Sequence, residues 1–123
     1  MPVCYLITWM IDMAVSFGYT EDFLRQMKHL RKKYPSLKKD YAALLEELEE
    51  NPLAGVDLGS GVHKVRMAIA SKGRGKSGGA RVITYCVSQL GDEVKVTLLA
   101  VYDKSEIENV SDAYIQSLLK SLG

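Results

Sequence analysis

Six basic side chains lie in one long stretch of the chain that contains no acidic residue, between Asp57 and Asp92. They are Lys64, Arg66, Lys72, Arg74, Lys76 and Arg81. In an extended strand, alternate side chains share a face, so Lys64 and Arg66 point the same way and Arg81 can join them from the next strand. Converging cations stabilise the charge that develops on a reacting phosphate. The pattern favours an anionic partner, nucleic acid first, with a solvated charged surface as the alternative.

A glycine-rich segment lies between these strands and satisfies a relaxed phosphate-loop pattern over residues 70–77, with Ala70 in place of the first glycine. A phosphate loop follows a strand and opens a helix, whereas this segment runs through Gly78 and Gly79 into a second strand-like run. The sequence therefore disfavours nucleotide hydrolysis. It favours a basic hairpin loop whose glycines let the backbone approach a polyanion and whose charges are Lys72, Arg74 and Lys76.

The histidines and cysteines indicate no conventional catalytic pair and no metal centre. His63 alternates to the face opposite Lys64, and His29 lies in a basic, helix-like segment, so they form no acid–base pair. Cys4 and Cys86 form no CxxC motif, and Cys86 belongs to an apolar run typical of a packed thiol. We expect no metal, no cofactor and a reducing, cytoplasmic environment.

The periodicity of apolar residues predicts an α+β fold that positions the cations on a sheet. Thr20 and Ser36 begin two successive helical patterns, with Pro35 between them, and Ser111 begins a third near the end of the chain. Alternation with a period of two predicts strands at 13–19, 62–70, 81–87 and 94–102, with a turn at Gly91-Asp92. We expect a small antiparallel sheet with an N-terminal helical hairpin on one face and a C-terminal helix.

Length and composition are those of one globular domain. The chain has 123 residues, of which 47% are hydrophobic and 25% charged, and its net charge is +1. Residues 1–12 are apolar but lack the basic start of a signal peptide, and Asp12 interrupts them before a membrane-spanning length. We expect an apolar appendage over 1–12, a domain over 13–123 and no membrane partner.

The basic segments resemble those of the RelE/HigB toxin superfamily. The matching runs are KVR at 64–66, ASKGRGKSGGARVITY at 70–85 and YDKSE at 102–106. TEDF at 20–23 and KYPSL at 33–37 are similar to the helical hairpin of the same family. The resemblance implies a RelE-like fold and a toxin of a type II toxin–antitoxin pair. Such toxins cleave messenger RNA without a metal, by 2′-hydroxyl attack and in most branches on the ribosome, and a cognate antitoxin silences them.

The resemblance also implies roles for individual residues. Lys64 and Arg66 match the paired basic strand positions, Arg81 matches the phosphate-stabilising arginine, and Lys104 matches the basic residue after the last strand. The best-known branch carries a tyrosine past the final strand that is proposed to take the proton of the 2′-hydroxyl. Val110 occupies its place here, and Tyr102 is the nearest substitute. The remaining cations of the glycine-rich segment are candidates for contacts with the RNA backbone, namely Lys72, Arg74 and Lys76.

A second function is compatible with the same residues. A catalytically weak member of the fold would use the basic face to bind RNA or its antitoxin and act in transcriptional autoregulation. It would show salt-sensitive binding without cleaved messages.

Overall fold

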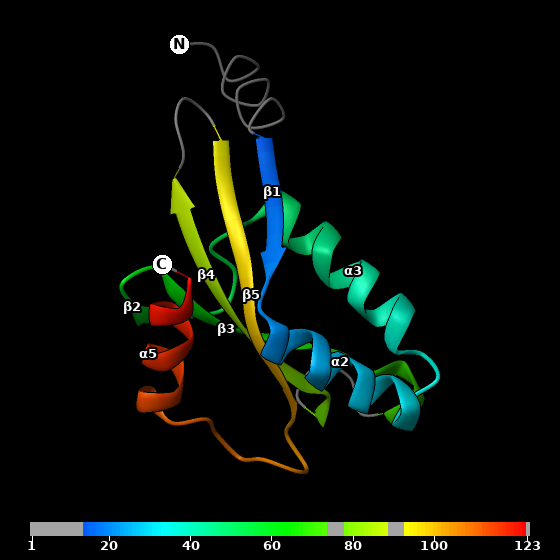
Figure 1. The fold of residues 1–123 in the computed structure, drawn as a ribbon. Coiled ribbons are helices and arrows are strands. Elements are labelled where there is room, and N and C mark those ends of the chain that lie inside the picture. Colours follow the sequence, from blue (N-terminus) through cyan, green and yellow to red (C-terminus); the bar gives the residue numbers. More distant parts are fainter. Residues whose placement is uncertain (1–13, 74–77, 89–92, 123) are drawn as a thin grey trace, which may run out of the picture.

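The computed structural model describes residues 14–73, 78–88 and 93–122, and its strands form one five-stranded sheet in the order β1-β5-β4-β3-β2 (Figure 1). The strands are β1 (Ala14–Tyr19), β2 (Val56–Gly59), β3 (Val62–Met67), β4 (Ala80–Ser88) and β5 (Glu93–Asp103). The helices are α2 (Glu21–Lys33), α3 (Leu37–Glu50) and α5 (Asp112–Ser121), with a 3₁₀ turn, η1, at Ala70–Lys72. The predicted α+β class is confirmed. The appendage predicted at residues 1–12 and the turn at 91–92 lie outside the described residues.

Three features of the sheet differ from the prediction. β1 pairs with β5 in parallel. The chain between these strands, which includes the helical hairpin, is long enough for the crossover that a parallel pair requires. β2 is an edge strand of four residues, exposed throughout, and its alternation of Val56 and Leu58 with Asp57 and Gly59 is too short to identify a strand. β3 ends at Met67 instead of continuing to Ala70, and the following backbone amides bond to side chains near the start of α3. Ala70 N donates to the Asp40 carboxylate at 3.2 Å and Ser71 N donates to Ser36 Oγ at 2.9 Å.

Helices cover both faces of the sheet, and each face has its own apolar core (Figure 1). The first core joins α2 and α3 to the sheet through Phe23, Leu30, Leu44 and Leu48, all of which are buried. The second core lies beneath α5, and its buried members are Val62, Ile83, Leu99, Ala100, Tyr102, Ile115 and Leu118. The helical hairpin and the C-terminal helix therefore lie on opposite faces.

A β-bulge in β5 anchors the start of α2. Ile83 pairs with Ala100 but Thr84 pairs with Leu98, which leaves Leu99 as an extra residue. Thr20 accepts a hydrogen bond from Phe23 N at 3.0 Å as the N-cap of α2, and its hydroxyl donates to the Leu99 carbonyl at 2.7 Å. One buried hydroxyl therefore satisfies both the end of a helix and the irregular part of a strand.

A buried carboxylate at the end of β5 ties three segments together. The Asp103 side chain accepts hydrogen bonds from the hydroxyl of Tyr34, from the Lys72 ammonium group at 2.7 Å and from Ser105 N and Oγ at 2.9 and 2.7 Å. Burial alone would raise the pKa of Asp103, but these hydrogen bonds outweigh it and hold the pKa well below its ordinary value. Asp103 therefore joins the end of α2 and η1 to the start of the connection between β5 and α5.

Replacing Thr20 by valine should lower the free energy of unfolding by about 1–2 kcal/mol, because the N-cap acceptor and the donor to Leu99 are both lost. Urea unfolding monitored by circular dichroism measures the change. Thr20→Ser retains the hydroxyl and should stay close to wild type. Equal losses in the two variants would contradict the role of the hydroxyl.

Lowering the pH should reduce the contribution of the Asp103 cluster to the free energy of unfolding. Because its pKa is lowered in the folded state, the stabilisation is complete above the ordinary value of 3.8 and declines as the pH falls below it. The contribution should drop by about 1 kcal/mol at pH 3. Unfolding free energies from pH 7 to pH 3 measure this, with Asp103→Asn as the reference that lacks the titrating group. A constant difference between the two proteins across this range would contradict the assignment.

Candidate functional site

Strand pairing brings cationic side chains to the α5 face of the sheet. Arg66 on β3 pairs with Arg81 on β4, and Arg81 pairs with Tyr102 on β5. Paired residues of neighbouring strands point to the same face, and Lys64 shares that face because it lies two residues before Arg66. The structure thus places Lys64, Arg66 and Arg81 on one face, as the alternation predicts.

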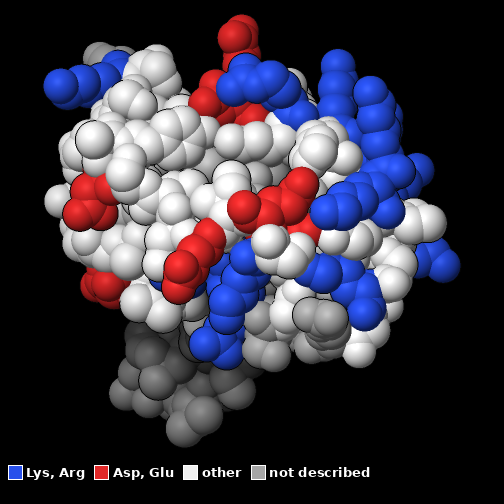
Figure 2. Space-filling view, turned by 90° about the horizontal axis from the view of Figure 1, so that it is seen from below, with Lys and Arg blue, Asp and Glu red and all other residues white. Residues whose placement is uncertain are grey.

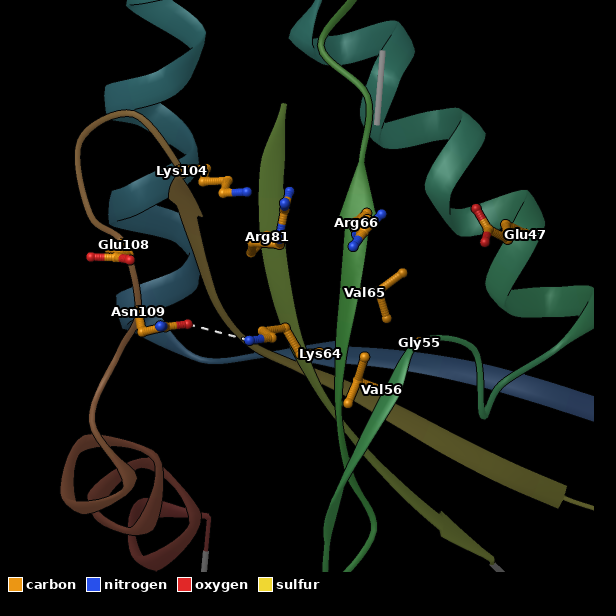
Figure 3. A pocket seen from close by; sticks show the side chains of 10 residues that line it. All are labelled: Glu47, Gly55, Val56, Lys64, Val65, Arg66, Arg81, Lys104, Glu108 and Asn109. Atoms are coloured by element: carbon orange, nitrogen blue, oxygen red, sulfur yellow. Dashed lines mark hydrogen bonds between the residues drawn. The ribbon is translucent and has the colours of Figure 1, made fainter. Parts of the chain in front are cut away.

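These three side chains and Lys104 line one pocket of about 520 Å³ (Figure 3). Lys104 follows the end of β5, and its backbone N–H donates to the carbonyl of Gly79 at 3.4 Å. The other residues that line the pocket are Glu47, Gly55, Val56, Val65, Glu108 and Asn109. Four cations from three segments of the chain therefore surround one space that is open to an anionic ligand.

The four cations differ in how firmly they are held. Arg81 is only 6% exposed, and its Nη1 donates to the Ala80 carbonyl at 3.2 Å, so its guanidinium group is pre-positioned. Lys64 is half-buried and its ammonium group donates to Asn109 Oδ1 at 3.3 Å. Arg66 and Lys104 are exposed. The pocket therefore combines one buried cation with one half-buried and two exposed cations.

Two glycines allow the backbone to close around this site. A Cβ at Gly79 would lie 2.2 Å from the Met67 carbonyl oxygen, at the end of β3. Gly55 has φ +97°, and a Cβ there would lie 2.4 Å from the Lys64 carbonyl oxygen. Any larger residue would push the segments before β2 and β4 away from the strand that carries Lys64 and Arg66.

Tyr102 does not line the cationic pocket. It is 4% exposed and belongs to the core beneath α5, and its hydroxyl has no hydrogen-bond partner among the described residues. Burial raises the pKa of this phenol, against a smaller lowering by Arg81. The surroundings of Tyr102 therefore do not favour the predicted role in proton transfer.

The predicted RNA contacts of the glycine-rich segment fall into two groups. Lys72 is held by Asp103 and its side chain is only 9% exposed, so this cation serves the buried carboxylate and is not presented to a ligand. No local sequence pattern shows that Lys72 forms an ion pair with an aspartate 31 residues away in the chain. Arg74 and Lys76 lie outside the described residues.

The remaining candidates lie outside the pocket. His63 is buried on the face opposite Lys64, as alternation predicts, and His29 contacts Glu106 at 3.1 Å on the surface. Cys86 is half-buried, and burial raises the pKa of its thiol, which fits a packing role. Among the described residues, no three His, Cys, Asp or Glu side chains are grouped so that they could hold a metal ion.

Sequence reasoning missed three polar residues of the pocket, Glu47, Glu108 and Asn109. Glu47 is one of four glutamates near the end of α3, and Glu108 and Asn109 lie in an irregular connection. No spacing in the sequence distinguishes them from solvated surface residues. Only the packing of α3 and of the 104–111 connection against the sheet brings them to the cations.

A second group of basic side chains lies on the helical hairpin. The last turn of α2 carries Arg31, Lys32 and Lys33, and Figure 2 shows Lys and Arg side chains gathered on that side of the molecule. No helix in the described part of the chain is both long and apolar enough to cross a membrane.

Comparison with protein families agrees with this architecture. A family model described as the RelE toxin of the RelE/RelB toxin–antitoxin system matches residues 20–122. The match begins at the N-cap of α2 and continues to the end of α5, so it includes the helical hairpin, the strands β2 to β5 and every residue of the cationic pocket. With most of its length matched and the expected α+β fold present, the chain belongs to the RelE family of toxins from toxin–antitoxin systems.

Proposed function

We propose that this toxin is a ribosome-dependent endoribonuclease that cleaves messenger RNA without a metal ion and so inhibits translation. The observation that supports the proposal is the convergence of Lys64, Arg66, Arg81 and Lys104 on one pocket. The phosphodiester of RNA is the ligand that this set of charges suits, because its negative charge grows as the phosphorus becomes pentavalent. Membership of the RelE/RelB system implies an antitoxin partner.

The reaction is an attack of the ribose 2′-oxygen on the adjacent phosphorus. The O2′–P bond forms as the P–O5′ bond breaks, which leaves a 2′,3′-cyclic phosphate and a 5′-hydroxyl. Arg81 and Arg66 hold the non-bridging oxygens, since a guanidinium group presents several donors in a fixed plane. The ammonium groups of Lys64 and Lys104 neutralise the remaining charge, and one of them supplies the proton for the departing 5′-oxygen.

The ribosome supplies orientation that the pocket lacks. Two of its four cations are exposed, and the aromatic hydroxyl on the same sheet face is buried. A message held in the decoding site presents its ribose–phosphate linkage in a fixed geometry, which lowers the entropic cost of reaching the transition state. Arg74 and Lys76 are the proposed contacts with the RNA backbone.

Replacing Arg81 by alanine should abolish growth arrest, because the most firmly held cation of the pocket is lost. We expect a decrease in cleavage rate of about 100-fold or more. Mapping of transcript 5′ ends after brief induction measures cleavage directly. Co-purification with the antitoxin shows that the variant still folds, which matters because Arg81 is buried.

A fully toxic Arg81→Ala protein would show that the pocket is not the active site. Wild-type protein that binds RNA or its antitoxin but generates no new 5′ ends would favour the regulatory binding function over the nuclease.

Removing the charge of Lys104 should reduce the salt dependence of binding to message-programmed ribosomes. One lost phosphate contact to single-stranded RNA lowers the slope of log affinity against log salt concentration by about 0.7. Lys104→Ala is compared with Lys95→Ala, an exposed lysine on β5 that does not line the pocket. Filter binding at several salt concentrations measures both slopes. Identical slopes for the two variants would contradict a phosphate contact at Lys104.

A further inference from the structure

Attack by a 2′-hydroxyl requires a group that accepts its proton, and few residues of the pocket have that capacity. Protonated lysine and arginine side chains carry donors but no acceptor. Asn109 is an amide, and its oxygen already accepts from Lys64 at 3.3 Å. Among the described residues that line the pocket, the carboxylates are those of Glu47 and Glu108.

The two carboxylates are presented by different kinds of structure. Glu108 is exposed and lies on the irregular connection between β5 and α5. Glu47 is half-buried and lies on α3, one turn from Leu44 and immediately before Leu48, which are 2% and 0% exposed. Groups held on a helix that is anchored in a core keep their position better than groups on a loop.

Glu47 also lies beside a cation of the pocket. Glu47 and Arg66 line both the main pocket and a smaller adjoining cavity of about 90 Å³ at the junction of α3 and β3. In Figure 3 the Glu47 side chain extends from α3 toward β3, whereas Lys64, Arg81 and Lys104 lie on the other side of Arg66. Glu47 therefore lies on the Arg66 side of the pocket, opposite the side that the 104–111 connection lines.

The other glutamates of α3 do not share this position. Glu46, Glu49 and Glu50 are exposed, and none of them lines the pocket. The helix therefore directs one of its four glutamates toward the cations, while neighbours of the same chemistry point to solvent.

We infer that Glu47 is the proton acceptor of the cleavage reaction. This assignment rests on the proposed nuclease function. The 2′-hydroxyl transfers its proton to the Glu47 carboxylate as the O2′–P bond forms. A pocket ammonium group protonates the 5′-oxygen as the P–O5′ bond breaks, so the proton count balances over the reaction. Glu47 would then carry the chemistry that the buried Tyr102 is poorly placed to perform.

The test compares Glu47→Gln with Glu46→Gln, a matched change on the exposed side of the same helix. Ribosomes programmed with a short message serve as substrate, and the single-turnover rate is measured with excess toxin. Binding is measured separately on the same message with a 2′-deoxynucleotide at the cleavage position, which cannot react. Glu47→Gln should cleave about 100-fold more slowly or worse while binding within twofold of wild type, and Glu46→Gln should match wild type in both.

A second substrate separates a proton acceptor from a proton donor. Sulfur in place of the bridging 5′-oxygen makes a leaving group that needs no protonation. The defect of Glu47→Gln should persist on this substrate, because proton removal from the 2′-hydroxyl is still required.

Three kinetic results would overturn the assignment. They are a wild-type rate for Glu47→Gln, rescue of its rate by the sulfur substrate, and a defect that appears in Glu108→Gln instead. Loss of binding to the unreactive message would also overturn it, because Glu47 would then hold the site together and not accept a proton. If the wild-type toxin cleaved no message, the proposed nuclease function itself would be refuted, and this outcome is distinct from failure of the Glu47 assignment.

Discussion

The site depends on holding like charges together. Arg66 and Arg81 face each other across paired strands, an arrangement that is unfavourable in isolation because directly opposed like charges repel. The opposite sides of these strands carry buried residues such as Val65 and Val82, which pack against the helical hairpin. The packing of apolar side chains on one face of these strands thus compensates for the repulsion between the two arginines on the other face. An anion bound in the pocket would relieve that repulsion, which is what the proposed function requires of these cations.

Positive charge in this protein serves two distinct purposes. Lys72 belongs to the same acid-free stretch as the pocket cations, yet it neutralises the buried carboxylate of Asp103. That ion pair holds the chain at the point where β5 passes into the 104–111 connection, which supplies Lys104, Glu108 and Asn109 to the pocket. Lys72 therefore stabilises the connection that presents Lys104 to the pocket. Composition alone does not separate these uses, because the side chains are chemically alike.

Local patterns predicted the helices and most of the sheet. Thr20 and Ser111 accept hydrogen bonds at helix starts as their sequence context indicates, and alternation along 62–67 correctly separates Lys64 from His63. These predictions succeed because helix capping and strand alternation act over a few residues. The parallel pairing of β1, the edge strand β2 and the end of β3 at Met67 were missed. Each depends on partners distant in the chain, such as Asp40 and Ser36 for the turn after β3.

The amino-acid sequence by itself determined the fold class, the family resemblance and the shared face of Lys64 and Arg66, since these follow from residue types and short-range periodicity. The tertiary structure alone decided which charges meet. It brought Lys104 and, from α3, Glu47 to the pocket, withdrew Lys72 into an ion pair and buried Tyr102 beneath α5. The physical reason is that side-chain direction is a local property of a strand or helix, whereas proximity between segments depends on strand register and on how the helices pack on the sheet.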